Sequence, residues 1–451
     1  MPWRIQEPRI SGEFPNFKQQ PTTITNMSNR RSFLKSAGLA ALSLPLMSFD
    51  QSQNWSLDPL KRHFETPDDY WAMIRKQFPL KEGQTYFNNG TMGPTPGYTI
   101  DVMINHMLHW NKEAATVDYK NGSGPELLSG YFPYQELREK LGSLINCNFK
   151  EISITQNATF GMNYVGMGLD LKPGDELLNT NQEHGGGFGA WQTLAKRKGC
   201  VYKQATMPVP ANDPQQIYES VFKEVTPKTK VIAIPHMVSV YGTIMPVKAI
   251  CEEARRRGIF TVLDGAQCVG HIDVDVKDIG CDAYYSSLHK WLLAPPGSGL
   301  LYVNKEVASS IWSTIASYNW DNQDDHGFRL MQNGTGNPAL IAGYSAAVDF
   351  FNSVGKDRWL GRIKELGAYL RNGLKQMPHV TIHSSTNEAM AAGITTYAVK
   401  GYTGPELQQT LWEREKLQPR SVGNELLRHS VHIYNSKAEI DKALDVIKNL
   451  A

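Results

Sequence analysis

Between about residues 135 and 325, short apolar runs alternate with stretches that are long enough to form a helix. Most of the runs are bounded by turn residues, and they read "EISIT", "ELLNT", "KVIAIPH", "IFTVLDGAQ", "AYYSSLHK" and "GLLYVN". This alternation predicts βαβ units, and therefore an α/β fold with a mostly parallel sheet and helices on both of its faces. Because ligands of such sheets bind beyond the carboxyl ends of the strands, the residues that follow each run are the first candidates for function.

The length of the chain, 451 residues, indicates two domains or one large α/β domain with a smaller appendage. After "NGTGNPAL" (333–340), a helix-like stretch from residue 339 to 351 leads into a region with a strand-then-helix pattern. The expected divisions are an N-terminal extension (1–58), a segment that joins the small domain (59–100), a large domain (101–335) and a small C-terminal α+β domain (336–451).

Composition excludes some classes of partner and site. The chain has 46 Lys+Arg and 44 Asp+Glu, so no electrostatic footprint for a nucleic acid stands out, and no nucleic-acid partner is expected. Its five cysteines are scattered and show no CxxC spacing. This spacing argues against a structural zinc site and against a disulfide framework.

The N-terminal stretch "SNRRSFLKSAGLAALSLPLMS" (28–48) joins Arg30 and Arg31 to a mildly apolar segment that is too short to span a bilayer comfortably. It resembles the twin-arginine export signal, which implies export by the twin-arginine machinery and a periplasmic location. Met27 is then an alternative start. No clear A-x-A site follows, so cleavage is left open, and the other interpretation is an amphipathic N-terminal helix of a cytosolic protein.

Four polar features follow or neighbour the predicted strands: Lys290 in "SSLHKW", Asp264 with Gln267 in "LDGAQ", Thr159 in "TQNATFGMN", and His184 in "EHGGGFG". Each alone has an ordinary explanation, as a solvated lysine, a turn, a helix cap and an incidental histidine. Together they meet the needs of pyridoxal phosphate. A buried lysine has a lowered pKa and can form a Schiff base, a carboxylate can pair with the pyridinium nitrogen, a helix N-terminus can hold the phosphate, and a flat ring can stack on the cofactor.

From about Tyr86 to the C-terminus, a series of motifs occurs in a specific order. The series is "NNG", "NAT", "EH", "HMVSVYGTIMPV", "DGAQ", "SSLHK", "GTGN" and "RHSVHIYN". This part of the chain resembles the class V, fold type I pyridoxal-phosphate enzymes, which include aminotransferases, cysteine desulfurases and isopenicillin N epimerase. The resemblance implies a large domain with a mostly parallel seven-stranded sheet between helices, together with a smaller C-terminal α+β domain.

The resemblance also implies a role for individual residues and a homodimer with shared active sites. Lys290 forms the Schiff base, and Asp264 keeps the pyridine nitrogen protonated. The other cofactor contacts are Gln267 on the phenolic oxygen, His184 on the ring face, and Ala158, Thr159, Ser287 and His289 on the phosphate, with Thr335 on the phosphate of the neighbouring subunit. Asn89 and Arg428 resemble the groups that grip an amino-acid-like substrate, and the guanidinium fork of an arginine suits an α-carboxylate.

The reaction expected from the resemblance is exchange of the substrate amine with Lys290 to form an external aldimine, followed by loss of the Cα proton, with Lys290 as general base. Transamination, epimerisation and carbon–sulfur lysis all branch from that step. Persulfide-forming desulfuration is not expected, because the stretch 417–435, "LQPRSVGNELLRHSVHIYN", has no cysteine. The "NNG" and "HIYNS" segments are similar to the isopenicillin N epimerase-like branch.

Two alternatives come from other functional classes. One is a non-catalytic, ligand-binding member of the fold, which the presence of Lys290 and Asp264 disfavours. The other is a nucleotide-binding α/β protein, suggested by "GGGFG". Its glycines lack the GxGxxG spacing, and no acidic residue is placed to hold a ribose.

Overall fold

By its internal contacts the chain divides into residues 1–53 and residues 54–451. The computed structural model describes residues 55–115 and 132–450, all of which belong to the second unit. The stretch 28–48, which resembles an export signal, lies outside the described residues. Among the helices that the structure describes, none combines the length and the apolar character needed to cross a membrane.

A seven-stranded sheet forms the centre of the large domain, with the order β2-β8-β7-β6-β5-β3-β4. Only β8 runs opposite to the other six strands, because it pairs antiparallel with both of its neighbours. The strands are β2 (Ile152–Thr155), β3 (Glu176–Thr180), β4 (Val201–Ala205), β5 (Thr229–Pro235), β6 (Phe260–Asp264), β7 (Ala283–Ser287) and β8 (Gly299–Val303). The predicted fold class, α/β with a mostly parallel sheet and a smaller C-terminal domain, is confirmed.

Both faces of this sheet are buried, which explains why its strands read as continuous apolar runs. Val231 and Val262 belong to one hydrophobic cluster with α5 (Ala158–Gly168) and α6 (Gly189–Lys198). The residues next to them along the strands, Ile232 and Leu263, belong to the main cluster. That cluster also includes residues of α7 (Pro214–Lys223), α8 (Val247–Arg256) and α9 (Val276–Ile279). Successive side chains of a strand point to opposite faces, so each face has its own layer of helices.

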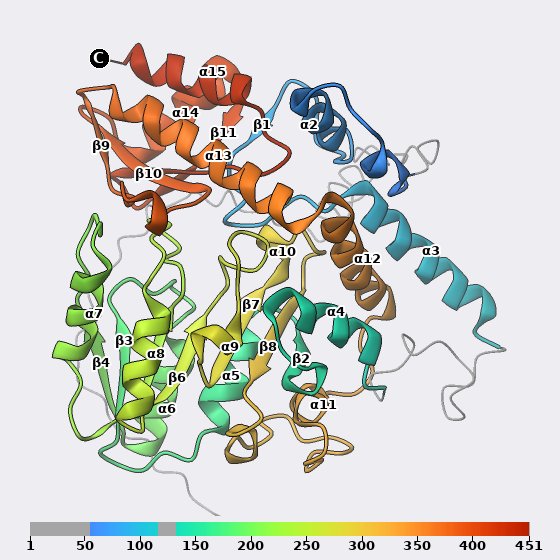
Figure 1. Ribbon diagram of the computed structural model, residues 1–451, viewed down its shortest axis with the longest axis vertical. Coiled ribbons are helices and arrows are strands. Elements are labelled where there is room, and N and C mark those ends of the chain that lie inside the picture. Colours follow the sequence, from blue (N-terminus) through green and yellow to red (C-terminus); the bar gives the residue numbers. More distant parts are fainter. Residues whose placement is uncertain (1–54, 116–131, 451) are drawn as a thin grey trace, which may run out of the picture. The chain divides into compact units, whose positions relative to one another are not determined.

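The small domain is built on a four-stranded antiparallel sheet with the order β12-β13-β10-β9. Its strands are β9 (Val380–Ile382), β10 (Ile394–Val399), β12 (Arg420–Val422) and β13 (Leu426–Ser430). Its helices are α13 (Lys356–Lys375), α14 (Gly404–Glu415) and α15 (Lys437–Lys448). Leu366, Leu407 and Ile440, one from each helix, share a hydrophobic cluster with Tyr397 and Leu427 of the sheet. Figure 1 shows this domain in orange and red beyond one end of the large sheet.

The N-terminal segment crosses from one domain to the other. Strand β1 (Thr85–Tyr86) pairs in parallel with β11 (Leu417–Gln418), and Phe87 packs in the small-domain cluster. Helix α3 (Gly97–Glu113) then lies beside α12 (Pro338–Val354), as Figure 1 shows. The two helices approach so closely that a Cβ atom at Gly343 would lie 2.7 Å from Met103.

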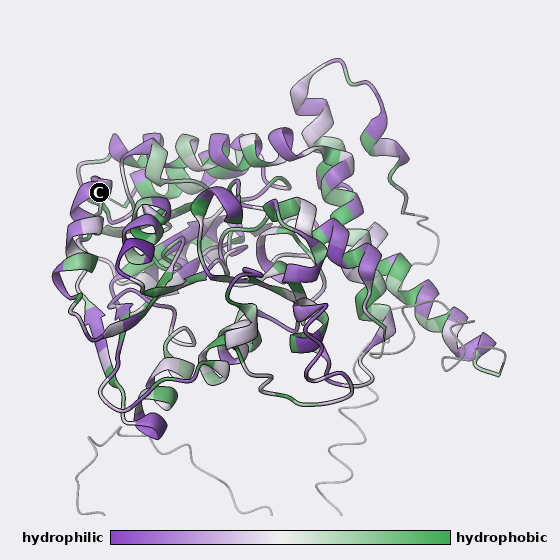
Figure 2. Ribbon diagram, turned by 60° about the horizontal axis from the view of Figure 1, so that its bottom comes forward, coloured by the Kyte–Doolittle hydropathy of each residue, from purple (hydrophilic) through white to green (hydrophobic). Residues whose placement is uncertain are grey.

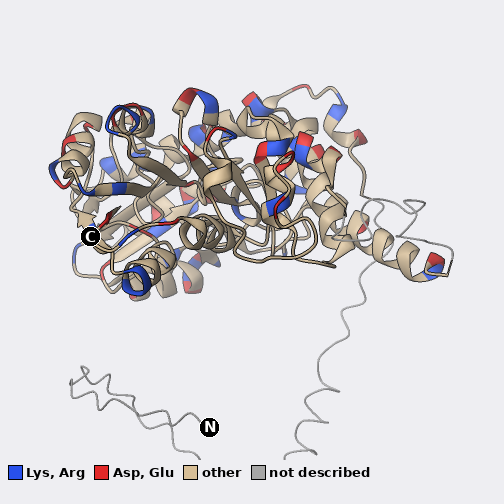
Figure 3. Ribbon diagram, turned by 90° about the horizontal axis from the view of Figure 1, so that it is seen from below, with Lys and Arg blue, Asp and Glu red and all other residues tan. Residues whose placement is uncertain are grey.

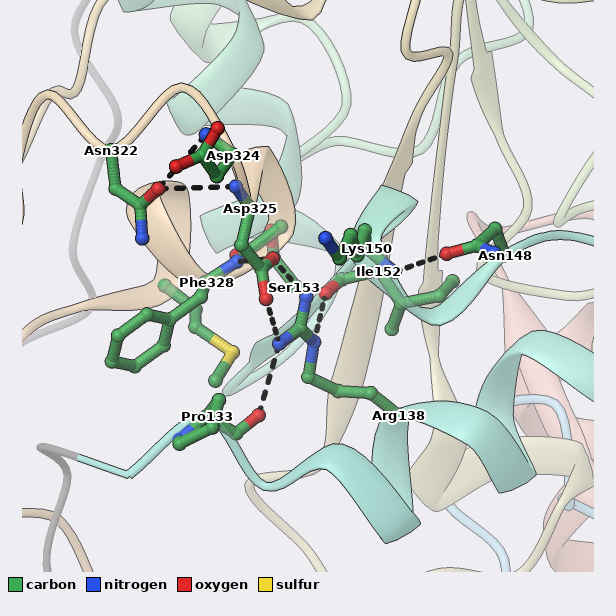
Figure 4. Close-up of polar contacts among 12 residues, drawn as sticks. Pro133, Arg138, Asn148, Lys150, Ile152, Ser153, Asn322, Asp324, Asp325 and Phe328 are labelled. Atoms are coloured by element: carbon green, nitrogen blue, oxygen red, sulfur yellow. Dashed lines mark hydrogen bonds and ion pairs between the residues drawn. The ribbon is translucent and has the colours of Figure 1, made fainter.

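Arg138 holds the edge of the large sheet together (Figure 4). It projects from α4 (Gln135–Ile145), is fully buried, and donates from Nε to the Ile152 carbonyl at 2.8 Å and from Nη1 to the Pro133 carbonyl at 3.1 Å. Its guanidinium also pairs with Asp325, which caps α11 (His326–Met331) by accepting from the Phe328 backbone N–H. One side chain thus connects α4, β2 and α11.

Short elements complete the described structure. The remaining helices are η1 (Asp58–Lys61), α2 (Pro67–Arg75), η3 (Phe149–Glu151), α10 (Leu288–Trp291), η4 (Ala308–Ser310) and η5 (Glu388–Met390). Figure 3 shows acidic and basic residues mixed over the outer helices, as expected for a chain with nearly balanced charge.

Candidate active site

A cavity of about 270 Å³ lies at the carboxyl ends of β5, β6 and β7. Parallel strands end together at one edge of their sheet, so Pro235, Asp264 and the turn after Ser287 meet there. The small domain and the N-terminal segment close the other side with Arg428 and Gly90. The structure brings nine of the eleven predicted site residues to this cavity: Ala158, Thr159, His184, Asp264, Gln267, Ser287, His289, Lys290 and Arg428.

Lys290 is the buried lysine that a Schiff base with the cofactor requires. Strand β7 ends at Ser287 and the one-turn helix α10 follows, so Lys290 enters the cavity with only 9 % of its surface exposed. Burial, with smaller contributions from Arg428 and Arg420, lowers the pKa of its ammonium group to about 8, although Asp264 acts in the opposite direction. About a tenth of the amine is therefore unprotonated at pH 7, far more than in an ordinary lysine, and a nucleophile or a general base requires this form.

Asp264 ends β6, beside β7, and its Cα is paired with that of Tyr285. Its Oδ1 accepts a hydrogen bond from the Ala266 backbone N–H at 2.8 Å. Burial raises the pKa of this carboxyl group, while that hydrogen bond and the charge of Lys290 act to lower it. A buried carboxylate with one backbone hydrogen bond and a nearby ammonium group is able to stabilise a protonated ring nitrogen.

Gln267 has one amide hydrogen left for a ligand. Its Oε1 accepts from the Trp291 indole N–H at 2.6 Å, and its Nε2 donates one hydrogen to the Gly90 carbonyl at 2.8 Å. Trp291 is itself fixed by stacking on His271, with ring centroids 3.4 Å apart and an interplanar angle of 7°. Because these contacts determine which end of the amide is the donor, the second N–H of Nε2 is available on the cavity side.

The N-terminus of α5 faces a group of donors that suits an anion. Asn157 caps the helix by accepting from the Phe160 N–H at 3.2 Å, and the Ala158 N–H donates to the Ser287 hydroxyl at 3.0 Å. His289 has its Nδ1 3.2 Å from the Ser298 carbonyl, so Nδ1 carries the proton and Nε2 is left for another partner. Burial, together with Lys290, lowers the pKa of His289. The helix N-terminus and the Ser287 hydroxyl form a cradle of donors for a phosphate group, whereas the neutral His289 ring beside them presents Nε2 as an acceptor.

His184 lies at the mouth of the cavity, in the loop after β3. Its Nδ1 accepts a hydrogen bond from the Gly186 N–H at 3.1 Å. Desolvation lowers the pKa of its ring, and the positive charges of Lys290, Arg420 and Arg428 act in the same direction. The imidazole is therefore held neutral, which suits stacking on an aromatic ligand better than a charged ring would.

Asn89 lies behind Lys290 and not in the wall of the cavity. It is fully buried. Its amide donates to the Lys290 carbonyl at 3.2 Å, and its oxygen accepts from the Tyr434 hydroxyl at 3.1 Å. In this structure Asn89 positions the Lys290 backbone, and the substrate contact expected for it stays a prediction.

Thr335 lies away from the cavity of its own chain. It is an exposed residue between α11 and α12, and it does not line the cavity. Its expected contact with the phosphate of a neighbouring subunit concerns a second chain and stays a prediction.

The lining residues that sequence reasoning missed include Gly90, Thr91 and Arg420. Arg420 on β12 lies directly opposite Arg428 on β13, in a hairpin whose register pairs the two residues. The turn residues Gly423 and Asn424 between two short apolar segments were a signal for that hairpin. Gly90 is required by close packing, because a Cβ atom there would lie 2.8 Å from the Ser430 hydroxyl oxygen.

Comparison with known proteins places the chain in a family. The model of the class-V aminotransferase family matches residues 128–443, so the chain belongs to that family. It is 28 % identical to isopenicillin N epimerase of Amycolatopsis lactamdurans, over 84 % of this chain and 98 % of the relative. It is 26 % identical to a probable cysteine desulfurase of Pyrococcus abyssi, over 84 % of this chain and 96 % of that protein.

A solved structure shows the same fold. The complex of a cystine C–S lyase with its reaction product, cysteine persulfide, superposes with a TM-score of 0.73 and 24 % sequence identity, over 83 % of this chain and 99 % of the other.

Pyridoxal phosphate is the cofactor of this family, and its prediction from the sequence is confirmed at that level. The side chains in the cavity fit the cofactor. Lys290 offers a buried amine, Asp264 a carboxylate for the ring nitrogen, and Gln267 a free N–H for the phenolic oxygen. The cradle at the start of α5 offers donors for the phosphate.

Proposed function

We propose that this protein is a pyridoxal-phosphate enzyme that acts on the amine of an amino acid or a peptidyl amino acid, with aminotransferase-like chemistry. The observation that carries the proposal is the placement of Lys290 and Asp264 after the ends of two adjacent strands, in the wall of a cavity that Arg428 also lines. The bound cofactor supplies an electron sink that stabilises negative charge at Cα. The aminotransferase, epimerase and lyase activities all depend on that effect.

The side chains of the cavity have separate roles in proton transfer and in substrate binding. Lys290, with a pKa of about 8, takes up and returns the proton at the substrate Cα. Arg428 is 3 % exposed, and its Nε–H is buried without a partner among the described residues, so it has donor capacity for a substrate carboxylate. The Ser239 carbonyl accepts from its Nη1 at 2.8 Å and fixes the direction of the guanidinium group.

Epimerisation and carbon–sulfur lysis are the alternatives, favoured by the names of the relatives. Desulfuration through an enzyme persulfide is disfavoured, because none of the five cysteines lines the cavity. Incubation with L-amino acids distinguishes the reactions. Transamination yields a 2-oxo acid, epimerisation yields the D-enantiomer, and lysis of a sulfur-containing substrate releases a thiol or a persulfide.

The first test is the visible absorption spectrum of the purified protein beside that of Lys290→Ala. We expect a visible band in the wild type that borohydride removes, and attachment of the reduced cofactor to Lys290, detected by mass spectrometry of the peptide. The variant is expected to lack the band. A colourless wild type that takes up no added pyridoxal phosphate would overturn the proposal in favour of a non-catalytic role.

We also propose that the protein is a homodimer with shared active sites. Large apolar side chains are exposed on α3 and in segment 312–320, including Leu108 at 61 %, Trp312 at 64 % and Tyr318 at 67 %. Hydrophobic and hydrophilic residues alternate along α3 in Figure 2. Exposed apolar surface of this kind favours association. Sedimentation at micromolar concentration should give twice the mass of one chain, and a monomer would contradict the proposal.

Export to the periplasm by the twin-arginine route is proposed from the stretch 28–48, in which Arg30 and Arg31 precede a mildly apolar segment. Cell fractionation is the test. The wild type should appear in the periplasmic fraction, and the double variant Arg30→Lys with Arg31→Lys should stay in the cytoplasm. Equal distribution of the two proteins would contradict export by this route.

A further inference from the structure

Arg420 and Arg428 are held together at the cavity by one hydroxyl group. The Thr91 Oγ1 accepts from Arg420 Nη1 at 2.8 Å and from Arg428 Nη2 at 3.0 Å. The same hydroxyl donates to the Asn88 Oδ1 at 2.7 Å, so both of its lone pairs are directed to the arginines. Asn88 Oδ1 also accepts from Arg428 Nη2, at 3.2 Å. The cluster therefore fixes two guanidinium groups side by side in the cavity wall.

The positive charge of this pair has no carboxylate partner in the described residues. Four described arginines besides Arg428 are buried, and three of them, Arg138, Arg362 and Arg371, each pair with a carboxylate. The fourth, Arg329, lies outside the cavity and donates to the Ile311 and Ala308 carbonyls, with no second arginine opposite it among the described residues. The hydrogen-bond acceptors of Arg420 and Arg428 are a hydroxyl, an amide oxygen and a backbone carbonyl, which are all neutral. Two like charges opposite each other on paired strands destabilise a hairpin, so the arrangement favours a bound anion.

Asp264 is the acidic residue that lines the cavity, and its position beside Lys290 assigns it to the cofactor ring. The phosphate group of the cofactor has its own donors at the start of α5. A single α-carboxylate on the substrate balances the charge of only one of the two guanidinium groups. The second group is left for another anionic group of the substrate.

We propose that the substrate carries two acidic groups, an α-carboxylate bound by Arg428 and a side-chain carboxylate bound by Arg420. The exposure of the two lining residues decides which carboxylate each one binds, because Arg428 is buried and Arg420 is exposed to solvent. The α-carboxylate enters first, and the side chain points toward the mouth. This inference rests on the proposed function and names the substrate class for the same site.

The test compares acidic amino acids with their neutral amides on the holoenzyme, by spectral titration at low ionic strength. L-Glutamate should bind about fivefold or more tightly than L-glutamine, and L-aspartate more tightly than L-asparagine, because each acid adds one charged pair at the mouth. Arg420→Met should remove this preference, mainly by weakening the binding of the two acids. Arg428→Met should weaken the binding of all four compounds.

Arg414→Met is the matched control, because Arg414 is exposed on α14 and lies outside the cavity wall. It should retain the preference of the wild type. A wild type that binds amides and acids equally, or an Arg420→Met variant that retains the preference, overturns the inference but leaves the proposed function standing. A holoenzyme whose spectrum responds neither to these four amino acids nor to any other amine overturns both the inference and the proposed function.

Discussion

Two opposing effects of the surroundings determine the pKa of Lys290. Burial and the two arginines favour the neutral amine, whereas Asp264 favours the ammonium ion, and the net result is a pKa of about 8. The same proximity acts in reverse on Asp264, whose burial raises its pKa while the ammonium group lowers it. Each residue thus limits the loss of charge that burial alone would cause in the other. Either residue without its partner would be shifted further.

The lowered pKa of Lys290 predicts how the stability of the cofactor-free enzyme changes with pH. Between about pH 8 and 10.5 the unfolded chain keeps the lysine proton that the folded protein has lost, so stability rises with pH in this window. Below pH 8 the buried charge lowers the stability. The methionine in Lys290→Met does not titrate. Relative to this variant, the free energy of unfolding of the wild type should rise by on the order of 3 kcal/mol across the window.

Urea unfolding of the two proteins at about pH 7.5, 9 and 10.5 measures this difference. These pH values cover the range between the pKa of Lys290 in the folded protein and its pKa in the unfolded chain. Lys305→Met is the matched control, because the Lys305 side chain is 73 % exposed. The free energy of unfolding of this control should differ from that of the wild type by the same amount at all three pH values. A constant difference for Lys290→Met as well would show that Lys290 is not held in a desolvated site.

At the scale of elements, the cavity depends on where strands end and on what holds those ends. Strand β2 leads through Asn157 into α5, whose N-terminus forms the phosphate cradle. Arg138 fixes the start of β2 through the Ile152 carbonyl and joins it to Asp325. The anion cradle is therefore supported by an ion pair at the edge of the sheet.

Arg138→Met should lower the free energy of unfolding by about 3 to 5 kcal/mol, because it leaves Asp325 without its buried partner and the Ile152 carbonyl without its donor. Chemical denaturation measures the effect. Arg197→Met, on an exposed position of α6, is the control and should change the stability by less than about 0.5 kcal/mol. Similar midpoints for the two variants would contradict the supporting role of Arg138.

Elements that rest on local pattern were predictable, and elements that rest on tertiary pairing were not. The six apolar runs form β2, β3, β5, β6, β7 and β8, because burial on both faces demands continuous apolar residues. Strand β4 has no such run. It lies at the sheet edge and its sequence, "VYKQA", includes the polar Lys203 and Gln204. A strand of this kind is stabilised mainly by its partner, which the sequence does not show.

The same distinction applies to the site. Lys290, Asp264 and Gln267 follow predicted strands, and the rule that parallel strands end together is enough to bring them to one edge. The position of Arg420 depends on hairpin register, and the orientation of Asn89 depends on Tyr434, which is 345 residues away. The sequence can identify such residues as candidates, but their orientation depends on how the two domains pack.

At the scale of the whole molecule, three distant parts of the chain converge behind Lys290. The N-terminal segment contributes Asn89, the large domain the Lys290 carbonyl, and the small domain Tyr434. The hydrogen bond from the Gly93 N–H to the His289 carbonyl, at 2.8 Å, adds a second connection between the first two parts. The position of the lysine therefore depends on the assembly of both domains with the N-terminal segment.

Asn89→Ala separates a positioning role from a substrate contact. Asn89 touches the Lys290 backbone and not the cavity, so the variant should lower kcat and leave KM nearly unchanged. It should also lower the free energy of unfolding by about 2 kcal/mol or more, because two buried groups lose their partner. The neighbouring variant Asn88→Ala is the control. Asn88 holds Arg428 and Thr91, so its loss should mainly raise KM. If Asn89→Ala instead raises KM with kcat intact, Asn89 contacts the substrate and the substrate-bound site differs from the one described.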